Sequence, residues 1–227
     1  MSGEWVRTWL RMSAAVVADQ AEWLTGLDAA IGDGDHGINL DRGFRRVLAT
    51  VDDPSAASLG AADLLTAAGR TIMGSVGGAS GALYGRALLR AGAAISLRAE
   101  TGISGPAGPE VLAGGQPGLL PVMAALDAAV DAIATLGRAQ RGDKTMLDAL
   151  VPSVEVLHES AAHGVTLAQA LAAAAAAAAD GLEATRPLVA RRGRASYLGE
   201  RSAGHLDPGA ASAALLIRAL ADTVPVE

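Results

Sequence analysis

Residues 119–136 read LLPVMAALDAAVDAIATL and set the expectation for the fold. Large apolar side chains recur there at spacings of three and four residues: Val122, Leu126, Val130 and Ile133. That period places them on one face of an α-helix, while Asp127 and Asp131 fall on another face, which we expect to be solvated. A helix with one apolar face buries it against other helices, so the segment is typical of a helix bundle.

The same spacing and its punctuation predict eight helical segments along the chain: Glu4–Leu27, Ile38–Thr50, Ser55–Met73, Ser80–Leu97, Leu119–Leu136, Lys144–Ala162, Thr166–Ala190 and Pro208–Asp222. Thr166 with Gln169 three residues later forms a capping-box pattern, and Pro208 suits a first helical position. Hydrophobic residues make up 51% of the chain and aromatic residues only 3%, a balance that favours helices over sheets. We therefore expect an all-α fold.

One stretch interrupts the helical pattern. Residues 101–118, TGISGPAGPEVLAGGQPG, carry six glycines and three prolines and cannot form a continuous helix. The segments on both sides are helical in the same way, and the polar motifs are divided across the stretch. We interpret it as a loop inserted into one domain that spans residues 1–227.

Charge and composition exclude several classes of protein. The net charge of −6 argues against nonspecific nucleic-acid binding, which needs a basic face, and the absence of cysteine excludes disulfides and thiolate zinc sites. The charged N-terminus does not resemble a signal peptide. The most apolar long tract, Leu171–Ala179, falls short of the roughly 20 residues of a membrane span. We expect a cytoplasmic protein without a membrane span.

An acidic turn is the first chemical motif. Asp28, Asp33 and Asp35 fall within eight positions, interleaved with glycines, in the sequence DAAIGDGDHG. Carboxylates so close repel one another, and a hard cation would neutralise them. An EF-hand is excluded, because a loop that starts at Asp33 has Phe44 where the final glutamate is needed. Magnesium fits better, although aspartate and glycine are also common in turns that bind nothing.

Three further turns are rich in glycine or charge. Residues 74–81, GSVGGASG, precede a predicted helix and form a plausible phosphate cradle, or else a site of close helix packing. The third motif is GDKT at residues 142–145, and the fourth is the polar run at residues 191–209. In that run Arg194 or Arg201 could bind phosphate through forked hydrogen bonds, whereas Arg191 and Arg192 suit the surface or a partner.

Together these motifs, IGDGDHG, SVGGASG, GDKT and GRASYLGERSAGHLDPGA, resemble the nucleotide-binding subunit of bacterial dihydroxyacetone kinases. The resemblance covers nearly the full chain in the same order. It implies a barrel of eight antiparallel helices with the nucleotide site at one end, which agrees with the predicted helix count. It also implies a kinase that needs a partner, since the subunits of this family carry no substrate site.

The resemblance further implies the residues of the site. Asp28, Asp33 and Asp35 would ligate two Mg²⁺ ions that bridge the phosphates of ADP or ATP. Arg194 would face the phosphates as the catalytic residue. The positions that match the family's nucleotide-binding residues are His36, Gly37, Ile38, Asn39, Ala79, Ser80, Gly137, Thr145, Arg194, Asp207, Pro208 and Gly209.

The implied partners are a separate subunit that holds dihydroxyacetone and a phosphohistidine carrier that phosphorylates bound ADP, because ATP-using relatives usually fuse both domains in one chain. Two alternatives stay open. The chain could be an ATP-dependent kinase subunit for another small ketose, such as erythrulose, or a coregulator that binds a transcription activator according to its nucleotide state.

Overall fold

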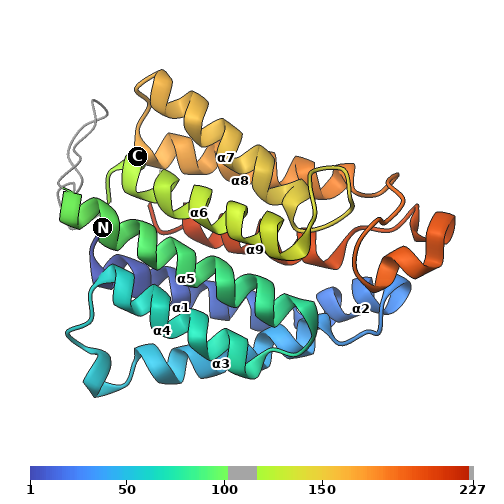
Figure 1. The fold of residues 1–227 in the computed structure, drawn as a ribbon, viewed down its shortest axis with the longest axis horizontal. Helices are drawn as coiled ribbons and strands as arrows, with labels where there is room; N and C mark the ends of the chain where they lie inside the picture. Colours follow the sequence, from blue (N-terminus) through green and yellow to red (C-terminus); the bar gives the residue numbers. More distant parts are fainter. Residues whose placement is uncertain (102–116, 225–227) are drawn as a thin grey trace.

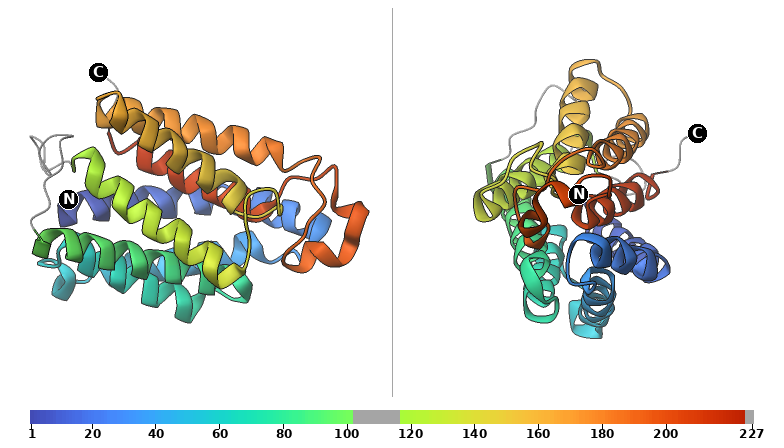
Figure 2. Two further views of the ribbon diagram at one scale, coloured as in Figure 1. Left: turned by 45° about the horizontal axis from the view of Figure 1, so that its top comes forward. Right: turned by 90° about the vertical axis from the view of Figure 1, so that its right-hand side faces the viewer.

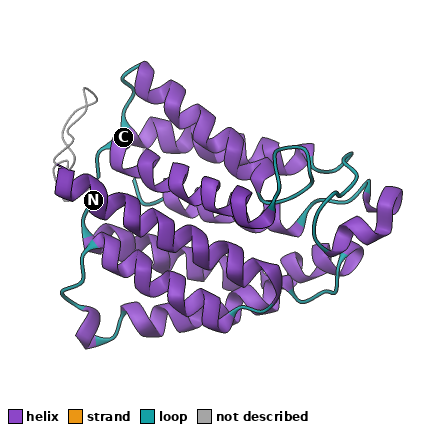
Figure 3. Ribbon diagram, in the orientation of Figure 1, coloured by secondary structure: helices purple, strands orange, loops and turns teal. Residues whose placement is uncertain are grey.

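Long helices run side by side along one axis of the molecule (Figure 1). The computed structural model describes residues 1–101 and 117–224. The regular elements in those ranges are α-helices and short 3₁₀ helices (Figure 3). In chain order they are α1 (Gly3–Asp19), α2 (Ala21–Ile31), α3 (His36–Val51), η1 (Pro54–Ala56), α4 (Ala61–Ser75), α5 (Gly78–Thr101), α6 (Leu119–Gly137), α7 (Leu147–Ala162), α8 (Leu167–Ala184), η3 (Arg194–Ser202) and α9 (Pro208–Ala221). The all-α prediction is confirmed.

Eight of these helices close into a barrel. From α3 to α9, each α-helix packs on the next one in the sequence, and α1 packs on both α3 and α9 and so completes the ring. The right-hand view of Figure 2 looks nearly along the helices and shows this arrangement. Short connections force neighbouring helices to run antiparallel. The eight-helix barrel is therefore confirmed, and α2 lies at one end of it (Figure 1).

The predicted first helix, Glu4–Leu27, is in fact two helices. Gln20 leaves helical geometry with φ −99° and ψ 8°, which separates α1 from α2. Its N–H still donates to the carbonyl of Val16, and its carbonyl still accepts from Leu24. Because the break costs so few hydrogen bonds and involves neither glycine nor proline, the apolar period runs through it unchanged and the sequence does not reveal it.

Three other predicted boundaries were wrong for identifiable reasons. Helix α4 begins at Ala61, not Ser55, because Gly60 follows a separate 3₁₀ turn that starts at Pro54. Helix α7 begins at Leu147, since Lys144 has a left-handed φ of 61°. Helix α8 ends at Ala184, three residues before a proline that disfavours helical geometry in the residue preceding it. The capping box at the start of α8 is confirmed.

The inserted loop predicted at residues 101–118 falls mostly outside the described residues, which stop at 101 and resume at 117. The polar run at residues 191–209, most of which lies between two predicted helices, contains η3, a 3₁₀ helix interrupted at Gly199 where φ is 55°. The run has no apolar periodicity from which this short helix could be predicted.

The barrel interior is apolar and incompletely filled. Leu10, Leu64 and Ile72 are fully buried there, and an apolar cavity of about 100 Å³ lies among α1, α4, α5, α6 and α9. Helix α6, rather than the alanine tract at Leu171–Ala179, is long and apolar enough to cross a membrane, with a mean hydropathy of 1.8. By length and composition a core helix passes the same test, and α6 packs between α5 and α7 in the barrel.

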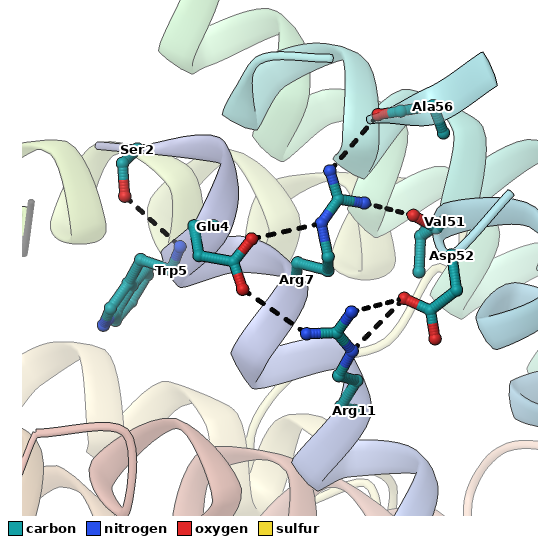
Figure 4. A network of polar contacts seen from close by, with 8 residues as sticks. All are labelled: Ser2, Glu4, Trp5, Arg7, Arg11, Val51, Asp52 and Ala56. Carbon is teal, nitrogen blue, oxygen red and sulfur yellow. Dashed lines mark hydrogen bonds and ion pairs between the residues drawn. The ribbon is translucent and has the colours of Figure 1, made fainter. Parts of the chain in front are cut away.

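A buried arginine ties the end of the barrel that lies opposite α2 (Figure 4). The guanidinium of Arg7 donates to the carbonyls of Val51, the last residue of α3, and Ala56 in η1. Helix C-terminal carbonyls lack partners within the helix and carry partial negative charge, so a buried cation there is favourable. Arg7 therefore fixes the α3 to α4 connection against α1.

We expect Arg7→Met to lower the free energy of unfolding by about 2–3 kcal/mol, because it leaves the buried carbonyl of Val51 without a donor and the carbonyl of Ala56 with only the N–H of Leu59. The matched control is Arg11→Met. Arg11 pairs with Asp52 at 2.8 Å on the surface, and such an exposed pair contributes about 1 kcal/mol or less. Chemical denaturation of the two variants and the native protein measures both values. Equal losses in the two variants would contradict the assigned role of Arg7.

Candidate functional site

A cleft of about 240 Å³ opens at the end of the barrel where α2 and η3 lie, the right-hand end in Figure 1. The N-termini of α3, α5, α7 and α9 all meet this end, because these helices run in the same direction in the barrel. Backbone N–H groups at helix N-termini have no partners within the helix and favour anions. The architecture therefore directs four such ends toward one region.

The acidic turn between α2 and α3 forms one wall of the cleft. Buried Asp28 accepts hydrogen bonds at Oδ2 from the N–H groups of Asp35, at 2.9 Å, and His36, at 3.2 Å. Only glycine fits at position 32, since a Cβ there would lie 2.0 Å from Asp28 Oδ1. These contacts orient the Asp28 carboxylate toward the rest of the turn.

The three predicted metal ligands come together. One oxygen each from Asp28, Asp33 and Asp35 lies within 4.8 Å of the other two. The first carboxylate is buried and the other two are exposed, so oxygen ligands converge from one side and the opposite side stays accessible to water and phosphate. That donor set suits Mg²⁺, which takes a few carboxylates and keeps several waters.

Arg194, in η3, reaches across the cleft to this cluster. Its Nη2 lies 3.1 Å from Asp33 Oδ2, and its side chain is 67% exposed. The pairing partly neutralises the acidic turn and places a guanidinium beside the predicted metal ligands. Of the two arginines predicted for phosphate binding, Arg194 lines the cleft, whereas Arg201 does not.

Ser80 and His36 connect the glycine-rich turn with the acidic turn. Helix α5 begins at Gly78, where φ is +68°, and two residues later Ser80 Oγ lies 3.1 Å from His36 Nδ1. His36 Nε2 lies 2.9 Å from Ser212 Oγ in α9. Burial lowers the pKa of His36, which favours the neutral imidazole at neutral pH. Both ring nitrogens are thus engaged by serine hydroxyl groups.

The GDKT turn and the start of α9 form the opposite wall. Asp148 accepts from the N–H groups of Gly142, at 2.5 Å, and Thr145, at 2.8 Å, and so shapes the turn. Asp207 caps α9 by accepting from Ala210 N at 2.7 Å. Burial raises the pKa of Asp207 to about 7, although the nearby ammonium group of Lys144 acts in the opposite direction.

All but two of the predicted site residues line this cleft. Those that do are Asp28, Asp33, Asp35, His36, Asn39, Ala79, Ser80, Gly137, Thr145, Arg194, Asp207, Pro208 and Gly209. Gly37 and Ile38 do not. Gly37 packs against α2, where a Cβ would lie 2.0 Å from the carbonyl oxygen of Ala21, and the Ile38 side chain is 58% exposed on the outer face of α3.

The cleft also contains residues that the sequence analysis missed. Leu83 and Ile133 lie one helical turn from the predicted residues Ala79 and Gly137, so helical spacing could have identified them. Arg192 was predicted to lie at the surface or to face a partner, but it lines the cleft, where its Nε lies 3.4 Å from Asp143 Oδ2. Lys144 and Met146 also line it, and no local pattern indicated the burial of either side chain.

Comparisons with known proteins show the family of the chain. The DAK2 domain family matches residues 30–222. The ADP-binding subunit DhaL of the PEP-dependent dihydroxyacetone kinase of Escherichia coli is 38% identical over 213 residues, which cover 94% of this chain and 93% of the relative. L-erythrulose 1-kinase of Mycolicibacterium smegmatis is also 38% identical, over 91% of this chain but only 33% of that longer protein.

The fold matches a solved structure as well. The crystal structure of the dihydroxyacetone kinase from C. freundii in complex with AMP-PNP and Mg²⁺ superposes with a TM-score of 0.67 and 26% sequence identity. The match covers 96% of this chain and 34% of that protein. The barrel described above is therefore similar to one part of a larger kinase.

Proposed function

The chain belongs to the DAK2 domain family, and from that premise we propose that it is the Mg²⁺- and ADP-binding subunit of a dihydroxyacetone kinase. The observation that carries the proposal is the convergence in one cleft of three carboxylates, an arginine and a glycine-rich helix N-terminus. Phosphoryl transfer requires mainly positioning and charge neutralisation, and these groups supply both. The proposed compartment is the cytoplasm.

In this proposal Asp28, Asp33 and Asp35 hold two Mg²⁺ ions. When bound, the ions would neutralise phosphate charge and orient the phosphates for transfer. The backbone contacts of Asp28 support the role, because they fix one carboxylate of the cluster. The number of ions follows from the family resemblance, and the short separation of the three carboxylates is compatible with it.

The nucleotide would occupy the remainder of the cleft. The N-terminus of α5, with Ala79 and Ser80, offers backbone N–H groups to phosphates. Leu83, Ile133 and Met146 line the same cleft and provide apolar surface of the kind that an adenine ring needs. Arg194 is the proposed catalytic residue, because its accessible guanidinium stands beside the acidic turn and can bind phosphate oxygens through forked hydrogen bonds.

The ketose and the phosphoryl donor are proposed to come from other subunits. The resemblance implies that dihydroxyacetone is held on a separate subunit. The E. coli relative is named as PEP-dependent, which supports a phosphohistidine carrier as the donor. The similarity to L-erythrulose 1-kinase supports a second candidate function, an ATP-dependent kinase subunit for another small ketose, such as erythrulose. A role as coregulator of a transcription activator rests on the family resemblance alone.

The proposed function is tested by an assay of the purified protein with a ketose-binding partner subunit. We expect dihydroxyacetone phosphorylation with a carrier charged from phosphoenolpyruvate and little with ATP. Bound nucleotide is measured by denaturing the purified protein and separating the supernatant by chromatography, with one equivalent of ADP expected. Turnover with ATP alone, or with erythrulose alone, would select the second candidate. No turnover with either donor would reject the kinase assignment.

We expect Asp33→Asn to weaken Mg²⁺-dependent ADP binding by about 100-fold, because the substitution removes a charged ligand from the cluster. The helical fold should persist, since relieving repulsion between acids costs the protein without ligand little. Isothermal titration with and without Mg²⁺, together with circular dichroism, measures both effects. Asp131→Asn on exposed α6 surface is the matched control. A loss of helicity in Asp33→Asn would indicate a structural metal instead.

We expect Arg194→Ala to lower kcat by about 100-fold and to change ADP affinity much less, because a guanidinium that acts on charge developing in transfer contributes mainly to the transition state. Arg191→Ala serves as the control, since Arg191 is exposed and does not line the cleft. Steady-state kinetics of the assembled kinase and ADP titrations of the subunit give the two quantities. Equal losses in kcat and affinity would contradict this role.

A further inference from the structure

Lys144 is the most deeply buried charged side chain of the cleft. It sits in the turn between α6 and α7, it is 1% exposed, and its backbone is left-handed with φ 61°. Left-handed geometry is unfavourable for a lysine, and burial of an ammonium group is costly. Both costs occur in one residue, which indicates that the side chain makes contacts that offset them.

Those contacts use every donor of the ammonium group. Nζ donates to the carbonyls of Thr185, at 2.8 Å, Leu188, at 3.1 Å, and His205, at 2.6 Å. A lysine ammonium has three N–H donors and no acceptor. A lysine in a nucleotide cleft is ordinarily interpreted as a phosphate ligand, but here no donor is left over for a phosphate.

The three carbonyls belong to two segments that are distant in the sequence from Lys144. Both segments lead into residues that line the cleft. Thr185 and Leu188 follow the end of α8 and lead into the run that holds Arg192 and Arg194. His205 precedes the Asp207 cap of α9.

The same two segments also bond to each other. Asp207 N donates to Thr185 Oγ1 at 3.0 Å, and Gly204 N donates to the carbonyl of Arg186 at 2.7 Å. The ammonium group of Lys144 therefore stands where the GDKT turn, the α8 end and the start of α9 meet.

Neighbouring charges are consistent with this arrangement. Burial lowers the pKa of Lys144, while the carboxylates of Asp207 and Asp148 act in the opposite direction and the guanidinium of Arg186 adds to the effect of burial. Three carbonyl oxygens replace the water that the ammonium group would lose on burial.

We propose that Lys144 is a positioning residue that sets nucleotide affinity without touching the nucleotide: its three carbonyl contacts hold the segment that leads into the arginine-bearing run, and the segment that leads into Asp207–Gly209, against the GDKT turn. The inference rests on the proposed function, because it concerns the same cleft. It predicts that loss of the ammonium group weakens all adenine nucleotides alike, since the whole wall shifts. A direct phosphate contact would instead weaken ADP more than AMP.

The absence of cysteine from the chain permits a sharp test. Lys144→Cys creates the single thiol, and 2-bromoethylamine applied to the unfolded protein converts it to S-aminoethylcysteine, which restores an ammonium group at nearly the lysine length. The native protein, taken through the same unfolding, reagent and refolding, is the control. ADP and AMP affinities are then measured with Mg²⁺, and hydrogen exchange is measured at residues 185–188 and 203–207.

We expect Lys144→Cys to weaken ADP and AMP by a similar factor of about 30, with faster exchange in those two segments and unchanged helicity. Aminoethylation should recover affinity and exchange protection to within about threefold of the refolded native protein. Affinity retained in Lys144→Cys, a loss confined to ADP, a general loss of helicity, or no recovery after aminoethylation would each overturn the proposal. Failure of the native protein to bind ADP would instead reject the proposed function.

Discussion

Repulsion among three carboxylates is the constraint around which the cleft is built. Asp28, Asp33 and Asp35 place oxygens within 4.8 Å of one another, and like charges so close are unfavourable unless other groups compensate. Two backbone N–H groups bond to Asp28, and Arg194 pairs with Asp33. In the proposed function the remaining negative charge would attract Mg²⁺, and binding of the ion would relieve the repulsion among the carboxylates.

The antiparallel orientation of the helices in the barrel makes this arrangement possible. Antiparallel packing brings the N-termini of α3, α5, α7 and α9 to the same end, so the positive ends of four helix dipoles lie around one cleft. An anion that would be repelled by the carboxylates alone meets favourable dipoles on the other walls. A nucleotide phosphate with its cation satisfies both kinds of wall at once, which neither a bare anion nor a bare cation does.

The basic residues of the cleft divide into different tasks according to burial. Arg194 is largely exposed, and its guanidinium can meet a ligand. Arg192 pairs with Asp143 of the GDKT turn. Lys144 is buried, and its ammonium group donates to three carbonyl oxygens. A cationic side chain whose donors all bond to protein carbonyls holds the segments of a site in place, whereas one with free donors can bind a ligand. The sequence alone does not distinguish these two roles.

The sequence by itself determined the helical class, because apolar periodicity is a local property. The antiparallel barrel and most of the cleft residues were predicted from the family resemblance that the glycine-rich and polar motifs carry. The sequence also placed Asp28, Asp33 and Asp35 together, since they share one short turn. Only the tertiary structure decided that Gln20 breaks the first helix, that Gly37 and Ile38 turn away from the cleft, and that Lys144 is buried. Each of these features depends on contacts between segments far apart in the chain, which no local sequence pattern encodes.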